Sequence, residues 1–141
     1  MGNRAVITFS TSKTTGAGLY LHWSGSLHSV LALCDTAREL GYRDPEGDGQ
    51  YAMARLIGLA CFADGLLSDT GLGVGQLREL DCDNGDNGVY VIGAGWRLVK
   101  RWGAGAEPLS VAAINAARSS VSYRAARAHL NSIHGVQNDA N

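Results

Sequence analysis

The sequence predicts an α+β fold: a mainly antiparallel sheet of about five strands with three helices, in the order β-β-α-α-β-β-β-α. Short runs of β-branched and aromatic residues near the start and in the middle of the chain are typical of strands. Two segments between them repeat apolar residues at helical spacing. An alanine-rich segment with similar spacing follows the last strand. Strands gathered on both sides of a helical pair favour an α+β domain over an alternating α/β one.

The first two strands are expected at Arg4–Phe9 and Gly18–Trp23, on either side of a polar turn. Because successive side chains of a strand point to opposite faces, Trp23 falls on the apolar face, whereas Tyr20 and His22 share the other. We therefore expect a hairpin with Trp23 in the core and His22 packed beside Tyr20.

Two helices should follow the hairpin. The first can be capped by Ser24 or Ser26 and ends at Gly41, a residue type that commonly terminates helices. The second covers Gln50 to about Ala63 and has almost no polar face. A helix that is apolar all round lies in a core or gives one face to an oligomer interface, so a homodimer is a candidate state.

The remaining elements are three strands and a terminal helix. The strands are expected around Leu72–Val74, Val89–Ile92 and Trp96–Trp102, and the helix over Val111–Leu130. A single domain should then cover residues 1–134, with residues 135–141 as a flexible C-terminal tail.

The composition is that of an ordinary globular protein, with 45% hydrophobic and 18% charged residues over 141 positions. The chain lacks the run of about 18 apolar residues that would span a membrane, and its start lacks the apolar core of a signal peptide. We therefore expect a cytoplasmic protein without a membrane partner. The three cysteines have no metal-site spacing, and no cofactor motif is present.

The net charge of −1 hides an asymmetry along the chain. Residues 1–95 carry six basic and eleven acidic side chains, a balance of −5. Residues 96–141 carry six basic and two acidic side chains, a balance of +4. Such a split favours polar docking surfaces or head-to-tail self-association.

The segment Asp81–Ile92 is the most informative of the chain. Its first eight residues hold three carboxylates, Asp81, Asp83 and Asp86, and two Asn-Gly pairs. Because Asn-Gly accepts positive φ, the segment predicts a tight turn that leads into a strand and projects its carboxylates into water. The spacing does not match the calcium loop of an EF-hand, because position 12 would be Ile92 instead of glutamate.

Three interpretations remain open for this acidic loop, residues 81–88. It could be a looser metal site, a solvated turn whose aspartates accept local backbone N–H groups, or a rigid set of carboxylates that imitates phosphates and binds a basic groove. The acidic segment Arg43–Gly49 could add to the same face. The candidate partner-binding residues are Asp81, Asp83, Asp86, Asn87, Asp44, Glu46 and Asp48, with Tyr90 and Trp96 as aromatic anchors.

Two other constellations give alternatives. His22 could act as a general base together with the aspartates of the acidic loop, in a small hydrolase-type enzyme. Since no serine or cysteine nucleophile has a recognisable context, a structural role for His22 is favoured, and no residue is predicted to be catalytic. The basic end could contact nucleic acid through Arg97, Lys100, Arg101, Arg118, Arg124 and Arg127. A solvated basic face, or one that pairs with the acidic half, is favoured instead, so nucleic acid is not an expected partner.

Three segments carry a resemblance to a known family: Leu19–Gly25, Gly41–Arg43 and Asp81–Tyr90. They resemble a family of small proteins carried by phages and mobile elements of bacteria. The resemblance covers roughly residues 1–102 and leaves out the alanine- and arginine-rich end. Small proteins in that genomic setting are often inhibitors of host defence, including anti-CRISPR and antirestriction proteins.

The resemblance and the acidic loop together predict a stoichiometric, anti-CRISPR-like inhibitor of a bacterial defence complex, acting in the host cytosol. The acidic loop would occupy a basic nucleic-acid-binding surface of a CRISPR-type complex. The expected partner is thus a protein complex, and the expected mechanism needs no metal, no cofactor and no catalysis.

Overall fold

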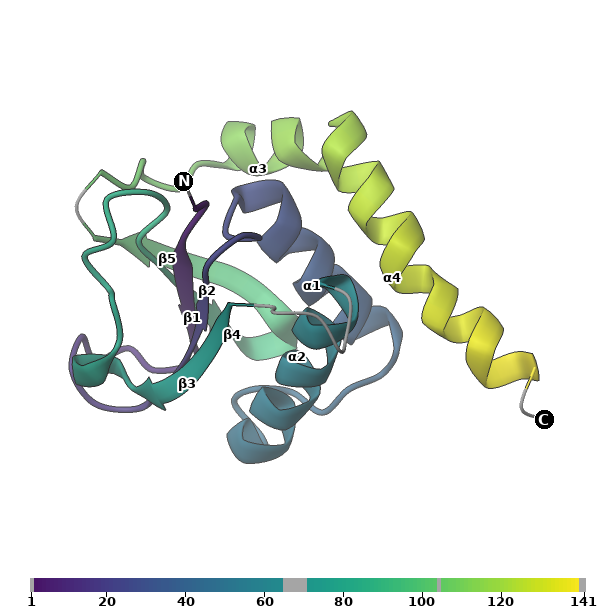
Figure 1. The fold of residues 1–141 in the computed structure, drawn as a ribbon, viewed down its shortest axis with the longest axis horizontal. Helices are drawn as coiled ribbons and strands as arrows, with labels where there is room; N and C mark the ends of the chain where they lie inside the picture. The colour runs from purple at the N-terminus through teal and green to yellow at the C-terminus, as the bar shows by residue number, and fades with distance from the viewer. Residues whose placement is uncertain (1, 65–70, 104, 140–141) are drawn as a thin grey trace.

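The computed structural model describes residues 2–64, 71–103 and 105–139, and for residues 134–139 only the path of the backbone. It shows an α+β fold (Figure 1). The strands are β1 Ala5–Thr8, β2 Ala17–Leu21, β3 Leu72–Gln76, β4 Val89–Gly93 and β5 Arg97–Trp102. The helices are α1 Leu27–Glu39, α2 Gly49–Asp64, α3 Val111–Arg118 and α4 Val121–Asp139, with short 3-10 turns η1 Leu77–Glu79 and η2 Ala94–Trp96.

The five strands form one mixed sheet in the order β3-β2-β1-β4-β5. Three neighbouring pairs are antiparallel, but the central pair of β1 and β4 is parallel. The five expected strands are confirmed, and the expectation of an antiparallel sheet is wrong at its centre. Since β3 and β4 run in the same direction with β2 and β1 between them, the chain has to cross a face of the sheet to join them.

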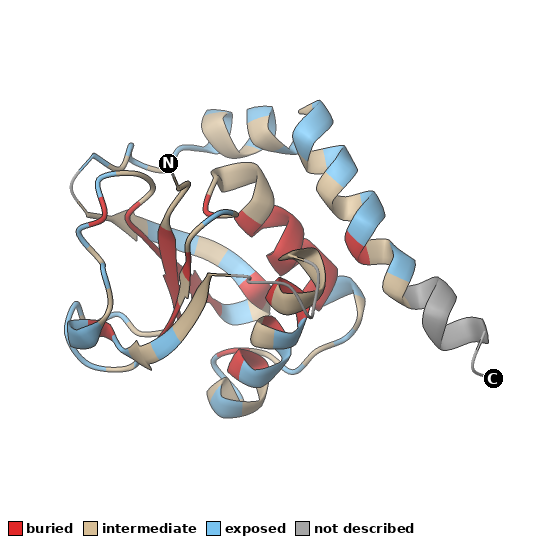
Figure 2. Ribbon diagram, in the orientation of Figure 1, coloured by how far each residue is buried: buried red, intermediate tan, exposed pale blue. Residues whose placement is uncertain are grey.

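Helices α1 and α2 cover one face of the sheet, and the main core lies between the two layers (Figure 2). Alternate strand residues such as Ile7, Leu19 and Tyr90 belong to this core and are fully buried. Helix α1 is buried continuously from Val30 to Ala37. It also contacts α3 and α4, so it forms the centre of the helical layer.

The opposite face of the sheet carries a smaller core. Residues 77–88, which lead from β3 to β4, cross this face. Leu77 packs there against Val6 of β1 and Val89 of β4, and Leu80 lies at the margin of the cluster. The acidic loop is therefore the second half of a crossover connection and not the turn of a hairpin.

The expected C-terminal helix over Val111–Leu130 is two helices, α3 and α4, so there are four helices in the described chain instead of three. The helical backbone is interrupted at residues 119–120, between the end of α3 and the start of α4. The Ser120 hydroxyl donates to the Ala117 carbonyl at 2.6 Å and accepts the backbone N–H of Tyr123 at 3.1 Å, and it thereby caps the start of α4.

Helix α4 continues to Asp139, past the end at residue 134 that the sequence predicted for the folded domain. Residues 140–141 of the expected tail lie outside the described residues. The flexibility of residues 135–141 stays a prediction.

Asp35 of α1 fastens the two C-terminal helices to the rest of the protein. Its side chain is 6% exposed and accepts two hydrogen bonds from Arg118, at 2.9 and 3.0 Å, and one from the Tyr123 hydroxyl at 2.6 Å. Arg38 donates a further bond at 2.8 Å. Burial alone would raise the pKa of Asp35, but the hydrogen bonds from Arg118 and Tyr123 and the charges of Arg118 and Arg38 lower it.

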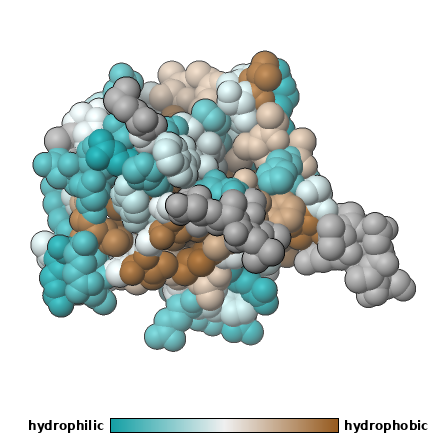
Figure 3. Space-filling model, in the orientation of Figure 1, coloured by the Kyte–Doolittle hydropathy of each residue, from teal (hydrophilic) through white to brown (hydrophobic). Residues whose placement is uncertain are grey.

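The surface mixes polar and apolar residues. On the face seen in Figure 3, hydrophobic residues form a band between hydrophilic regions. In α2, Gln50, Ala54, Arg55 and Gly58 are exposed, so the side of this helix away from the core mixes small and polar residues. The homodimer that the apolar character of α2 suggested stays a prediction. Among the described residues, no helix has the length and apolar character needed to cross a membrane.

Replacing Asp35 with Asn should lower the free energy of unfolding by about 2 kcal/mol, because hydrogen bonds to charged groups contribute about 1.5–3 kcal/mol and solvent screens the half-exposed arginines. Urea denaturation followed by circular dichroism measures the change. Glu107→Gln, at an exposed position outside the helical layer, is the control and should stay within about 0.5 kcal/mol of the wild type. Equal effects of the two substitutions would contradict the role of Asp35.

The same carboxyl group predicts a pH dependence. Because the pKa of Asp35 in the folded state lies below its ordinary value of 3.8, the stabilisation is fully present above that value and is lost as the pH falls through the folded-state pKa. The difference in unfolding free energy between the wild type and Asp35→Asn should therefore be largest near neutral pH and shrink in acid. Denaturation curves of both proteins over a pH series measure it, and a constant difference would be the contrary result.

Candidate functional site

The acidic loop, residues 81–88, delivers the chain from the crossover into β4. Gly85 and Gly88 have φ angles of +75° and +69°, in the region that favours glycine. A Cβ atom on Gly88 would lie 2.2 Å from the carbonyl oxygen of Trp102 on β5, so only glycine allows this close approach. The tight turn that the Asn-Gly pairs predicted is confirmed, within a crossover.

Asn84 holds the loop from inside. Its side chain is 3% exposed, and its Oδ1 accepts the consecutive backbone N–H groups of Asp86, Asn87 and Gly88 at 3.0 to 3.2 Å. Its Nδ2 donates to the carbonyl oxygens of Asp81 and Gly88 at 3.0 and 3.2 Å. One buried amide thus closes the loop, because every polar atom of the side chain binds loop backbone.

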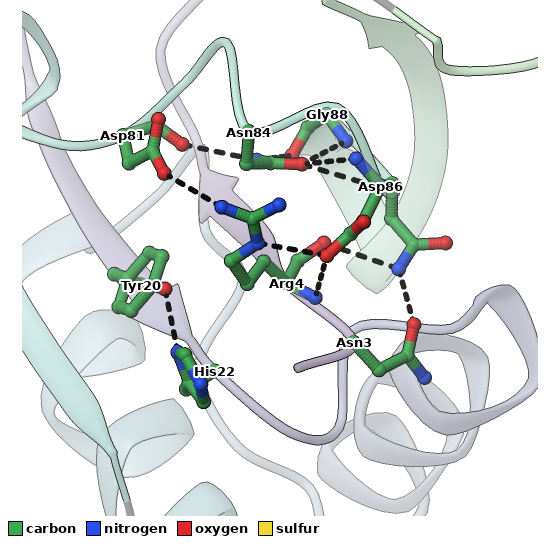
Figure 4. A network of polar contacts seen from close by, with 9 residues as sticks. Asn3, Arg4, Tyr20, His22, Asp81, Asn84, Asp86 and Gly88 are labelled. Atoms are coloured by element: carbon green, nitrogen blue, oxygen red, sulfur yellow. Dashed lines mark hydrogen bonds and ion pairs between the residues drawn. The ribbon is translucent and has the colours of Figure 1, made fainter. Parts of the chain in front are cut away.

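Arg4, at the entrance to β1, joins two of the three carboxylates (Figure 4). Asp86 Oδ2 accepts a hydrogen bond from Arg4 Nε at 2.8 Å and another from its backbone N–H at 3.1 Å. Asp81 pairs with Arg4 Nη1 at 3.5 Å. The side-chain hydrogen bond from Arg4, followed by the backbone one, lowers the pKa of Asp86. Asp86 therefore ties the loop to β1, and Arg4 offsets one of the three negative charges.

Asn87 forms the third attachment of the loop. Its Nδ2 donates to Asn3 Oδ1 at 2.6 Å and to the Arg4 carbonyl at 3.1 Å. Arg101 of β5 donates to the Asn87 carbonyl at 2.9 Å and to its Oδ1 at 3.1 Å. A residue expected to bind a partner and one expected to bind nucleic acid thus bind each other, and both expected roles stay predictions.

Asp81 and Asp83 form the outer side of the loop. Both residues are exposed, and the Asp81 side chain keeps 50% of its surface in contact with solvent even in the pair with Arg4. Asp86 is less exposed, at 29% of its side chain. Asp81 and Asp83 are therefore the more exposed aspartates of the loop, although Asp81 also pairs with Arg4, whereas Asp86 is held against the start of β1.

His22 lies beside the same loop. Its Nδ1 is 2.9 Å from the Tyr20 hydroxyl, so the expected packing against Tyr20 is confirmed (Figure 4). His22 also lines a hollow of about 360 Å³ together with Gly2, Arg4 and Asp86. Burial, and then the charge of Asp81, raises the pKa of Tyr20. The hollow brings His22 and Asp86 to one place, but each is already engaged by a neighbouring side chain.

Trp23 is not in the core as the strand alternation predicted. Its side chain is 52% exposed, because β2 ends at Leu21 and the alternation ends with it. The Trp23 ring stands edge-on to the His22 ring, with centroids 4.4 Å apart. An exposed aromatic side chain therefore lies next to the hollow.

Tyr90 and Trp96, the two predicted aromatic anchors, are buried. Tyr90 of β4 is 0% exposed and lies on the side of the sheet that faces the helices. Trp96 of η2, which follows β4, is 2% exposed and belongs to the same core. The Tyr90 hydroxyl donates to the Gly25 carbonyl at 2.9 Å, and the Trp96 indole donates to the Tyr42 carbonyl at 3.3 Å. The prediction that they contact a partner is wrong, since neither ring reaches the surface.

The second acidic segment does not extend the acidic loop. Asp44 accepts the backbone N–H of Gly95 at 2.7 Å, just beyond the C-terminal end of β4, whereas the acidic loop precedes the N-terminal end of that strand. A strand of this length separates its ends by about 15 Å. Asp48 caps α2 through the Tyr51 N–H and pairs with Arg43 at 2.9 Å, while Glu46 is exposed.

Two of the six basic candidates bind side chains of α1. Arg118 binds Asp35, and Arg127 donates to the Thr36 hydroxyl at 2.6 Å and pairs with Glu39. The basic end thus pairs with the acidic half of the protein at these positions, and contact of these arginines with nucleic acid stays a prediction. The other exposed basic candidates are Arg97 and Lys100 on β5 and Arg124 on α4.

Asp81, Asp83 and Asp86 are not arranged as a metal site, which was one of the three interpretations of the acidic loop. Across residues 2–64, 71–103 and 105–139, no group of three or more His, Cys, Asp or Glu side chains is arranged to hold a metal ion. The guanidinium of Arg4 lies between Asp81 and Asp86 instead. Cys82 is partly buried beside them, and burial, followed by the charge of Asp81, raises the pKa of its thiol.

Sequence reasoning missed Arg4 and Asn84, which are central to this site. The role of Arg4 has no local signal, since its carboxylate partners lie about 80 positions along the chain. Asn84 stands in a recognisable Asn-Gly pair, but burial of its amide follows from the crossover and not from the pair.

Comparison of the chain with protein-family models, with curated proteins and with solved structures finds no match. Function is therefore inferred from the site itself.

Asn84→Ala should lower the free energy of unfolding by about 2–3 kcal/mol, because buried backbone N–H groups of the loop lose their acceptor. Chemical denaturation measures it. Asn115→Ala, on the exposed side of α3, is the matched control and should be neutral or slightly stabilising, since alanine favours helix. A cost no greater than that of the control would show that the loop does not depend on Asn84.

Proposed function

We propose that this protein is a stoichiometric inhibitor of a bacterial defence complex, anti-CRISPR-like, that acts by protein–protein contact in the bacterial cytosol. Its acidic loop would bind a basic, nucleic-acid-binding surface of the complex. The observation that supports this most is the construction of the loop: the buried Asn84 amide holds a backbone that keeps Asp81 and Asp83 at the surface.

Stiffness matters because a preformed loop avoids the loss of conformational entropy on binding. Two exposed carboxylates on such a backbone can engage arginine or lysine side chains that otherwise hold phosphates. Asp86 contributes by fixing the loop on Arg4 rather than by contacting the partner. The proposed site is thus narrower than the sequence alone suggested.

Trp23 is proposed as the aromatic anchor in place of Tyr90 and Trp96. Its ring is half exposed and adjoins His22, which lines the same hollow as Asp86. Tryptophan is one of the residue types enriched among those that dominate binding energy at interfaces.

A small acid–base enzyme is the second candidate, favoured by one observation. His22 and Asp86 line one hollow, as a base and its orienting carboxylate would. Against it, Nδ1 of His22 binds Tyr20 and Asp86 binds Arg4. The two functions differ in stoichiometry, because an enzyme acts at trace amounts whereas an inhibitor titrates its target.

Asp83→Lys should reduce inhibition at least tenfold, because reversing an outward charge places like charges together across the interface. The measurement uses bacteria with active CRISPR-type or restriction systems, in which the wild-type protein should restore phage plaques. Glu107→Lys changes the net charge equally at a position outside the loop and is the control. Trp23→Ala should weaken inhibition in the same assay.

With the purified target, half inhibition should require about half a copy of the protein per complex, as expected for tight one-to-one binding. His22→Ala should retain inhibition. No protection of phage against any of the defence systems, or full inhibition by Asp83→Lys, would overturn the proposed function. Action at trace amounts that His22→Ala abolishes would support the enzyme instead.

A further inference from the structure

A second hollow, of about 480 Å³, lies between α1, β5 and α3. Three arginines line it, one from each element: Arg38, Arg97 and Arg118. Leu31, Leu98 and Ile114 supply an apolar lining. Ligand sites commonly have this size and this mixture of apolar walls with a few charged groups.

The arginines of this hollow are only partly neutralised. Asp35 Oδ1 accepts from both Arg38 and Arg118, which draws these two guanidinium groups together. Their side chains nevertheless remain 47% and 39% exposed. Arg97 is exposed and makes no side-chain hydrogen bond or ion pair with any described residue. Three positive charges against one carboxylate leave a local charge of about +2.

The charge and the shape indicate the class of ligand. A carboxylate would neutralise only half of the excess charge, whereas a phosphate monoester carries about −1.5 to −2 at neutral pH. Each guanidinium has five N–H donors, and only one of Arg38 and two of Arg118 are used by Asp35. Guanidinium groups match phosphate oxygens in geometry and also stack on flat rings. The apolar lining favours an organic group next to the phosphate.

We infer that this hollow binds a small phosphate monoester with a flat aromatic ring, such as a nucleoside monophosphate. Arg38 and Arg97 would hold the phosphate, and Ile114 would contact the organic group. The site is distinct from the acidic loop, because Arg97 follows the C-terminal end of β4 and the loop precedes its N-terminal end. The proposed phosphate site is therefore independent of the function proposed for the acidic loop.

Isothermal titration calorimetry of the whole chain with adenosine 5′-monophosphate, inorganic phosphate and adenosine tests the inference. The monophosphate should bind saturably with one site per chain and at least about tenfold more tightly than either inorganic phosphate or adenosine, since it engages both parts of the hollow.

Two variants locate the site. Arg97→Gln removes an exposed charge without breaking a contact of the fold and should weaken monophosphate binding about tenfold or more. Ile114→Ala should weaken monophosphate binding but leave inorganic phosphate binding unchanged, and the latter also shows that the variant is folded. Arg78→Gln removes an exposed arginine in η1 and should have no effect.

Absence of saturable binding by the monophosphate would overturn the inference. So would equal losses from Arg97→Gln and Arg78→Gln, because they would indicate attraction of an anion to a basic surface in general. Monophosphate and inorganic phosphate binding with equal affinity would overturn the role of the apolar lining and with it the proposed class of ligand.

Discussion

The buried side chain of Asn84 supports the most unusual part of this fold. A connection that crosses the face of a sheet exposes many backbone N–H groups that no strand can pair. Asn84 accepts three of them in a row and also donates to two carbonyls, so a segment without regular structure becomes a fixed part of the protein. Arg4 and Asn87 then join this segment to β1. The parallel pairing of β1 and β4 depends on this connection, because it carries the chain across the sheet.

A single polar side chain with several hydrogen-bond partners also attaches the two C-terminal helices. Asp35 accepts bonds from α3 and α4, two helices with few deeply buried residues. In both places one polar side chain with several partners attaches a segment that buries few apolar residues; among the described side chains of α4 the buried one is Leu130. The charge asymmetry of the sequence has its counterpart here, since Arg118 and Arg127 of the basic end pair with Asp35 and Glu39 of the acidic half. These pairs lie within the chain, so the asymmetry does not require self-association.

Local patterns were sufficient to predict the strands and the first two helices, because alternation and helical spacing report which face of an element is buried. They did not predict the parallel pairing of β1 with β4, which depends on contacts between distant segments. The break at Ser120 had a signal, a Ser-Ser pair within an alanine-rich stretch, but helical spacing on both sides concealed it. Trp23 was misplaced because the strand ends two residues earlier. In the candidate site, the carboxylates were found from sequence, whereas Arg4 was not, since electrostatic partners have no fixed spacing.

The central claim is that the acidic loop is a stiff part of the fold, ready to present Asp81 and Asp83 without reordering. The most direct test is the ¹⁵N relaxation of the backbone amides of residues 81–88 in the free protein. The order parameters of Asp86, Asn87 and Gly88 should equal those of the neighbouring strands, about 0.85 for a rigid backbone. Values below about 0.6 would describe a mobile loop and contradict the account.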